Sequence, residues 1–120
     1  MTTTRKINDL ITIVNDEQDV EERVYKLAEY VKADYNKCGY NSDFNVTVSK
    51  GRKYFKIVTD NSVHCFVDVK NGNVFKPESY NKPAKHVRYN LLQDAQDCYN
   101  KCDWAGGYLY DRSHLPSKYI

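Results

Sequence analysis

Side chains that can bind a nucleotide are concentrated between residues 75 and 90. Lysine and arginine donate charged hydrogen bonds to phosphate oxygens, and the planar guanidinium of Arg88 can donate two at once. Phe75 and Tyr80 can stack on a base, and the amide of Asn90 can pair with an adenine edge. The combination predicts a site for a phosphate-bearing ligand with a flat base. The full set of such side chains is Phe75, Lys76, Tyr80, Lys82, Lys85, Arg88, Tyr89 and Asn90.

The residue types that usually perform catalysis are poorly arranged in this sequence. His64 and Cys65 are neighbours on a predicted strand, so they point to opposite faces and cannot act as a base and its nucleophile. Cys98 and Cys102 lie one helical turn apart, but the CxxC pairs of zinc sites are absent. The carboxylates are scattered, and no glycine-rich phosphate loop follows a strand. We therefore predict a protein that is not an enzyme and has no metal site and no cofactor.

Length and charge restrict the class of protein. A chain of 120 residues is expected to form a single domain, 1–120, with a core that needs no covalent staples. The net charge of +2 comes from 18 basic and 16 acidic residues, far below the basic excess of non-specific nucleic-acid binders. A nucleic-acid partner is therefore not expected, and any positive site must be local.

The sequence shows no sign of secretion or of membrane insertion. Its first residues, MTTTRKINDL, lack the sustained apolar run of a signal peptide. No stretch approaches the roughly 20 apolar residues of a membrane span. The four cysteines, at positions 38, 65, 98 and 102, are therefore predicted to be reduced thiols of a cytoplasmic protein.

Helical periodicity predicts one long and one shorter helix. Residues 16–38 carry an apolar stripe that begins at Val20, acidic residues lie near the start, and Gly39 is a typical residue just beyond a helix end. Apolar residues from Leu91 to Cys102 predict the second helix. Residues 7–14 form a separate apolar stripe, which predicts a short helix or an arm that docks on another element: Ile7, Leu10, Ile11 and Val14.

Period-two alternation predicts strands in the middle of the chain. Expected strands cover residues 44–48, 53–59 and 63–69, and a return strand starts at 74. Asn71 and Gly72 are expected to form a tight hairpin turn with two positive φ angles. Pro77 should end the return strand or lie at an edge, because proline cannot donate to a ladder. Residues 108–110 are expected to form a last short strand or an extended segment.

Together these elements predict an α+β fold, an antiparallel four-stranded sheet packed against one long and one shorter helix. The apolar stripe at residues 7–14 adds apolar surface beyond what the amphipathic long helix needs for its own core. We therefore expect a homo-oligomer, at least a dimer.

The segment VHCFVDVKNGNVFKPESYNKPAKHVRYNLL, residues 63–92, resembles one that recurs in small proteins of tailed bacteriophages. Among such proteins the chain is most similar to the Thoeris anti-defence sponge family. The resemblance is strongest in the middle third of the chain and looser in the preceding helix and in the segment from Trp104 to Tyr110. Its shared positions are Gly72, Lys76, Pro77, Pro83, Ala84, Lys85, Arg88 and Asn90.

That resemblance implies a non-enzymatic oligomer acting in the host cytoplasm. It would capture glycocyclic ADP-ribose, a nucleotide immune signal, and some members of the family also bind cyclic oligonucleotides. By similarity, Tyr80 would stack on the base, Asn90 would donate a hydrogen bond, and Arg112 would contact the ring or the phosphate. Where this chain has Tyr80, the phage segment usually has tryptophan or another aromatic residue, so stacking is retained.

Other readings of the same residues remain open. The loop of residues 76–90 suits a phage single-stranded nucleic-acid-binding module as well as a nucleotide sponge. The eleven tyrosines suit a direct inhibitor of a host protein, because tyrosine is enriched in protein contacts. A small phosphodiesterase is disfavoured because paired histidines are missing. An ordinary solvated loop, with no ligand, is the remaining alternative.

Overall fold

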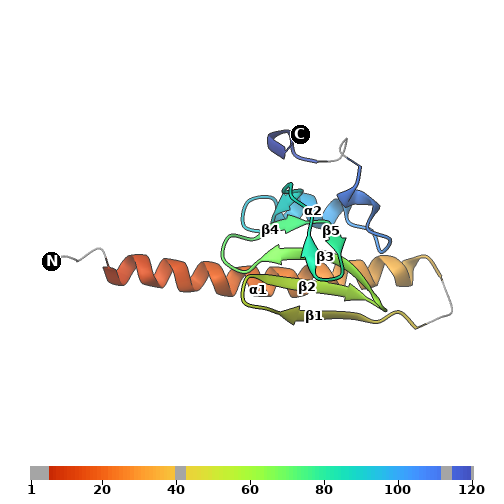
Figure 1. The fold of residues 1–120 in the computed structure, drawn as a ribbon, viewed down its shortest axis with the longest axis horizontal. Helices are drawn as coiled ribbons and strands as arrows, with labels where there is room; N and C mark the ends of the chain where they lie inside the picture. Colours follow the sequence, from red (N-terminus) through yellow and green to blue (C-terminus); the bar gives the residue numbers. More distant parts are fainter. Residues whose placement is uncertain (1–5, 40–42, 112–114, 120) are drawn as a thin grey trace.

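The computed structural model describes residues 6–39, 43–111 and 115–119, with side chains of the first helix described from Asp19 onward. Its architecture is α+β, as predicted (Figure 1). One long helix, α1 (Lys6–Lys37), runs along one face of an antiparallel sheet, and the short helix α2 (Ala95–Lys101) contacts both α1 and the last strand. Within the described ranges, no helix is long and apolar enough to cross a membrane.

Helix α1 is continuous, so the predicted boundary before residue 16 is wrong. The sequence contains neither glycine nor proline between Lys6 and Lys37, and Asn15 and Asp16 cost too little helix propensity to interrupt the backbone hydrogen bonds. The predicted end is confirmed, because Gly39 has a φ of 78° and its N–H donates to the carbonyl of Asn36. The predicted stripe is buried: Val20, Val24, Leu27, Val31 and Tyr35.

The main sheet has five antiparallel strands in the order β1-β2-β3-β4-β7. Four of them match the predicted positions, and Tyr89–Asn90 adds a fifth beside β4. A small separate hairpin, β5 (Pro77–Ser79) with β6 (Lys82–Pro83), follows β4, as expected from Pro77. The other strands are β1 (Val46–Lys50), β2 (Tyr54–Thr59), β3 (Ser62–Asp68), β4 (Asn73–Phe75) and β7 (Tyr89–Asn90).

The turn between β3 and β4 differs from the predicted two-residue turn. Only Gly72 has a positive φ, at 79°, and the connection spans residues 69–72. A carboxylate oxygen of Asp68 accepts hydrogen bonds from the N–H groups of Lys70 at 2.8 Å and Asn71 at 3.1 Å. This side-chain bonding stabilises a longer turn that needs glycine at only one position.

Two predicted elements near the C-terminus are shorter or of a different type. Helix α2 begins at Ala95 rather than Leu91, because the side chain of Asn90 accepts the N–H groups of Leu92 and Gln93 and turns the chain first. The expected strand at 108–110 is instead the 3-10 helix η1 (Gly107–Leu109). The backbone turns here, because the N–H of Leu109 donates to the carbonyl of Gly106 at 3.1 Å and that of Tyr110 to the carbonyl of Gly107 at 3.0 Å. A second such turn, η3 (Ser117–Tyr119), lies near the C-terminus.

Candidate functional site

Aromatic side chains cover the face of the sheet opposite α1, which we call the outer face. Strand β2 buries Phe55 and Ile57 in the core, so alternation directs Tyr54 and Lys56 outward. The ring of Tyr54 meets those of Phe66 from β3, at 5.8 Å, and Phe75 from β4, at 6.0 Å, both edge to face. The three rings therefore form one aromatic cluster across neighbouring strands, in which Tyr54 and Phe75 are half-buried and Phe66 is 3% exposed.

The β5–β6 hairpin places Tyr80 against Lys56 on this outer face. The ammonium of Lys56 lies 4.2 Å from the centroid of the Tyr80 ring and 5.7 Å from that of Phe66. It also donates a hydrogen bond to the side-chain oxygen of Asn81 at 3.2 Å. Tyr80 remains 55% exposed, so its ring is available to a ligand. A cation is thus held between two aromatic rings at the surface.

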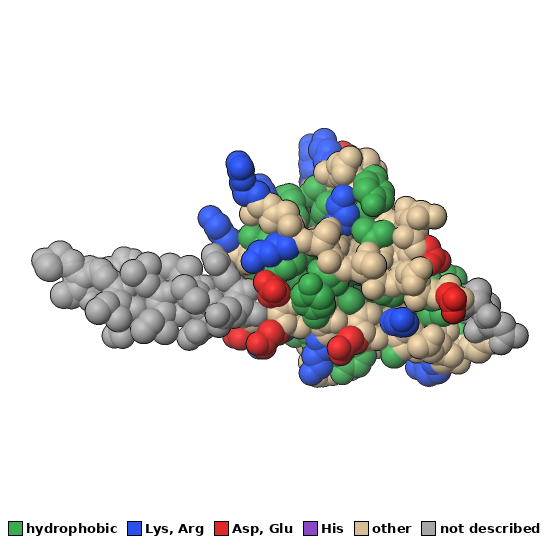
Figure 2. Space-filling view, turned by 90° about the horizontal axis from the view of Figure 1, so that it is seen from below, with side chains coloured by type: hydrophobic (Ala, Val, Ile, Leu, Met, Phe, Trp, Pro, Cys, Tyr) green, Lys and Arg blue, Asp and Glu red, His purple; other side chains and the backbone are tan. Residues whose placement is uncertain are grey.

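A hollow of about 290 Å³ opens on the outer face next to Lys56, and we call it the outer hollow. Arg52 and Lys53, from the turn between β1 and β2, and Lys56 contribute its positive charge. Lys50 also lines the hollow, but its ammonium is directed to the α1 side of the sheet, where it pairs with Glu21 at 3.3 Å. Figure 2 shows Lys and Arg side chains projecting together at the end of the sheet where this turn lies in Figure 1. The lining residues are Ser49, Lys50, Gly51, Arg52, Lys53, Tyr54, Lys56 and Phe66.

The structure brings together only part of the predicted site. Tyr80 and Phe75 both belong to the outer face, through Lys56 and Tyr54 respectively. Lys85 is exposed on the segment between β6 and β7 and is not among the residues that line the outer hollow. Arg112 lies outside the described residues.

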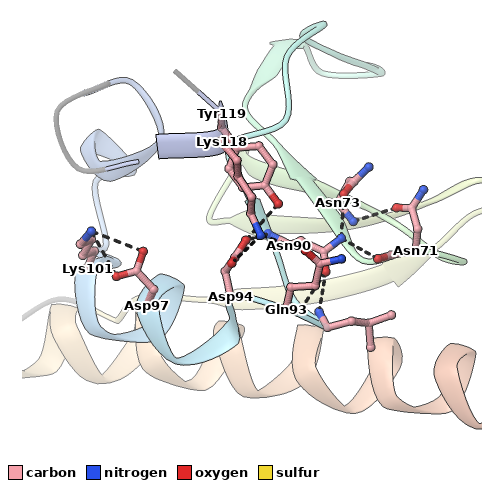
Figure 3. Close-up of polar contacts among 10 residues, drawn as sticks. Asn71, Asn73, Asn90, Gln93, Asp94, Asp97, Lys101, Lys118 and Tyr119 are labelled. Atoms are coloured by element: carbon pink, nitrogen blue, oxygen red, sulfur yellow. Dashed lines mark hydrogen bonds and ion pairs between the residues drawn. The ribbon is translucent and has the colours of Figure 1, made fainter. Parts of the chain in front are cut away.

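Asn90 is predicted to contact a ligand, but its side chain instead forms hydrogen bonds within the fold (Figure 3). It is 6% exposed, and its amide nitrogen donates to the carbonyl of Asn71 at 2.8 Å and to the side-chain oxygen of Asn73 at 2.7 Å. Its side-chain oxygen accepts from the N–H groups of Leu92 and Gln93. Both donors and both acceptor positions are used, so none is left for an adenine edge.

Arg88 is also buried rather than presented on an exposed loop. Its side chain is 5% exposed, and its N–H donates to the carbonyl of Val74 at 2.8 Å. The sequence predicts an exposed loop over residues 76–90. The pairing of β7 with β4 draws Arg88, Tyr89 and Asn90 into the body of the domain instead.

The site residues that the sequence reading missed lie earlier in the chain. Arg52, Lys53 and Lys56 are absent from the predicted ligand-binding set, although Lys53 and Lys56 fall in the predicted strand at 53–59. A signal was present, because the stretch KGRKYFK at 50–56 contains four basic residues and no acidic one. Counting charge in short windows would have marked this stretch as the local positive site that the near-neutral net charge requires.

The buried histidine is poorly suited to proton transfer. The Nε2 atom of His64 and the hydroxyl of Tyr108 are 2.8 Å apart, below the surface. Burial lowers the pKa of His64 to about 4, while the nearby Asp103 opposes that shift. The imidazole therefore stays neutral at physiological pH, and its contact with Tyr108 joins β3 to η1. Among the described residues, no group of three or more His, Cys, Asp or Glu side chains could hold a metal ion.

Two hollows elsewhere are somewhat larger but less suited to an anion. One, of about 360 Å³, is lined by Lys101, Asp103, Gly107, Tyr108 and Asp111. Lys101 is paired with Asp97 at 3.1 Å, so acidic groups dominate this hollow. The other, of about 350 Å³, lies between α1 and α2. The opposite charges of Asp34 and Lys37 leave its lining without a net charge. Of these three hollows, the outer hollow is the one whose lining is mainly cationic.

Comparison with known proteins identifies the family. A model described as a family of unknown function, DUF7717, matches residues 5–111, so the chain belongs to that family. Neither the curated proteins nor the solved structures include a match.

Proposed function

We propose that this member of DUF7717 is a phage counter-defence protein that binds and sequesters a nucleotide immune signal in the host cytoplasm without cleaving it. Following the resemblance, the signal is glycocyclic ADP-ribose, and the outer hollow with Tyr80 at its margin is its binding site. The phosphates would meet Arg52, Lys53 and Lys56, and the base would stack on Tyr80.

The observation that carries this proposal is the position of Lys56 between the rings of Tyr80 and Phe66. A nucleotide presents negative phosphates beside a flat base, and the outer face presents cations beside exposed aromatic rings. Arginine and lysine bind phosphate oxygens by charge-assisted hydrogen bonds, and aromatic stacking contributes about 1–3 kcal/mol per base.

The chemistry of the outer hollow favours binding over cleavage. Catalytic proton transfer at neutral pH works best with a group that titrates near neutrality, and lysine and arginine ordinarily remain charged there. Sequestration needs affinity alone, and nanomolar binding corresponds to about −12 kcal/mol. One stacked base and two or three charge-assisted hydrogen bonds of about 1.5–3 kcal/mol each give about 4–12 kcal/mol. Nanomolar affinity therefore needs the upper end of these contributions and a preorganised site that keeps the entropy cost of binding small.

We further propose a homo-oligomer, at least a dimer, built through α1. The helix has 32 residues and is therefore about 48 Å long, whereas the longest strand has seven residues and spans about 23 Å. The backbone of α1 accordingly extends beyond the sheet (Figure 1). The extending part contains the apolar sequence positions Ile7, Leu10, Ile11 and Val14, and a second copy of the helix is the partner that would bury them.

Calorimetric titration of the protein with glycocyclic ADP-ribose tests the proposal. Saturable binding in the nanomolar range, with the ligand recovered unchanged by mass spectrometry after incubation, is the expected result. Absence of binding, or recovery of a cleaved product, would overturn it.

A further inference from the structure

A second hollow adjoins the outer hollow across the turn between β1 and β2. It has a volume of about 270 Å³, and we call it the end hollow. Arg52 and Lys53 line both hollows. The N–H of Val69 donates to the carbonyl of Lys53 at 2.9 Å, which fixes the end hollow against the turn. Its lining residues are Arg52, Lys53, Asp68, Val69 and Lys70.

The end hollow is cationic, because its lining contains three basic side chains and one carboxylate. Asp68 accepts hydrogen bonds from the N–H groups of Lys70 and Asn71, at 2.8 and 3.1 Å. The single negative charge of Asp68 is outnumbered by the positive charges of Arg52, Lys53 and Lys70. Positive charge therefore continues from Lys56 on the outer face, past the turn, to Lys70 at the end of β3.

Together, the two hollows have room for a longer ligand than the outer hollow alone. Small-molecule pockets usually have volumes of roughly 300–1,000 Å³ and bury most of their ligand. The outer hollow lies near the lower end of that range, and the two hollows together fall well within it. An aromatic ring lies where they meet, because Tyr54 is paired with Asp68 in the sheet and the ammonium of Lys53 is 5.4 Å from its ring centroid.

We propose that the surface formed by the outer hollow and the end hollow also binds a linear single strand of nucleic acid. One phosphate would lie in each hollow, and the Arg52–Lys53 turn would lie between the two successive nucleotides. Strand β1 is at the edge of the sheet, so a chain can enter and leave without threading. Proteins that bind single strands combine a cationic groove along the backbone with aromatic rings for the bases. The inference goes beyond signal sequestration and shares only the outer hollow with it.

Binding to three probes distinguishes the two proposals. The probes are AMP, glycocyclic ADP-ribose and a fluorescein-labelled oligothymidylate of about twelve nucleotides, a length within the usual site sizes of single-strand binders. The variants are Lys70→Gln in the end hollow, Lys56→Gln in the outer hollow, and Lys32→Gln as a control on an exposed position of α1. Affinities are measured by anisotropy or calorimetry across a series of salt concentrations.

We expect Lys70→Gln to weaken oligothymidylate binding by roughly three- to tenfold and to reduce its salt slope by about 0.7, the value for one phosphate on a single strand. AMP and glycocyclic ADP-ribose should bind this variant as they bind the wild type. Lys56→Gln should weaken all three ligands, and Lys32→Gln none.

Each outcome bears on one proposal separately. If the oligothymidylate does not bind, or binds no better than AMP, the strand inference fails while signal sequestration stands. If Lys70→Gln weakens all ligands equally, the end hollow is not a second phosphate site and the inference fails as well. If the strand binds with the expected Lys70 dependence and glycocyclic ADP-ribose does not, the inference stands and signal sequestration fails.

Discussion

The ammonium of Lys56 on β2 lies 4.2 Å from the ring centroid of Tyr80 on the β5–β6 hairpin. This contact joins two segments that are far apart in the sequence and places a cation beside an exposed ring. An ion pair between Glu78 on β5 and Lys82 on β6, at 3.0 Å, links the two strands of this hairpin. The proposed nucleotide binding rests on this pairing of the cation with the ring.

Replacing Tyr80 with alanine should weaken nucleotide binding by about 1–3 kcal/mol, or roughly ten- to a hundredfold, because a stacking surface is lost. The melting temperature should change little, since the side chain is 55% exposed. Calorimetric titration and a thermal melt measure the two effects. Tyr25→Ala, at a tyrosine of 51% exposure on α1, is the matched control. Equal affinities of the two variants would exclude Tyr80 from the site.

Replacing Asn90 with alanine should destabilise the fold by about 2–4 kcal/mol. The change leaves the N–H of Leu92, the carbonyl of Asn71 and the side-chain oxygen of Asn73 without these partners, and an unsatisfied group that water does not reach costs about 1–3 kcal/mol. The N–H of Gln93 keeps its hydrogen bond to the carbonyl of residue 90 at 3.2 Å. Urea unfolding measures the loss. The exposed Asn61→Ala is the control and should stay within about 0.5 kcal/mol of wild type. An unchanged unfolding midpoint for Asn90→Ala would contradict the structural role.

Stability should decrease on mild acidification because of His64. Burial lowers its pKa from 6.5 to about 4, so between these values the unfolded state binds more protons than the folded state. The stabilisation is complete above the unfolded pKa and declines as the pH falls, by up to about 1.4 kcal/mol per pH unit. From about pH 7.5 to about pH 5, the predicted loss is about 2 kcal/mol.

Urea unfolding at the two pH values measures this loss. The variant His64→Gln removes the titrating group, so it should show a smaller loss over the same interval, although it is less stable throughout. If wild type and variant lose the same stability on acidification, groups other than His64 determine the pH dependence.

One cysteine should react much faster than the others with a thiol reagent. Cys38 is exposed, whereas Cys65 and Cys98 are buried and burial raises the pKa of both thiols. Burial likewise raises the pKa of Cys102 to about 12. Because the thiolate is the reactive form, the native protein should show one fast thiol, which Cys38→Ser removes. Four fast thiols would contradict this burial.

A reductant should leave the melting temperature unchanged, since all four thiols are free.

Light scattering should give a mass at least twice the 14.0 kDa of the chain. The physical reason is the proposed burial of apolar positions of α1 between copies. Leu10→Glu, which places a charge in that stripe, should shift the assembly toward the monomer, and Lys32→Glu, at an exposed position of α1, should leave the mass unchanged. A monomer at high concentration would refute the oligomer.

The secondary structure was largely predictable because it depends on local patterns. Alternation in residues 46–68 identified three strands, and the stripe from Val20 to Tyr35 identified the buried face of α1. Gly39 marked the helix end for a reason that acts within one turn of the chain. The errors in the β3–β4 turn and at the start of α2 arose where the side chains of Asp68 and Asn90 bond to the backbone.

The site depended on contacts that no local pattern encodes. By itself, the sequence determined that cations and aromatic rings are present and that positive charge must be local. Only the tertiary structure decided which of them meet, because Lys56 and Asn81 are 25 positions apart and join through the folding of the β5–β6 hairpin over β2. The same long-range pairing, of β7 with β4, buries Asn90 and Arg88, since a strand added to the sheet removes its side chains from water.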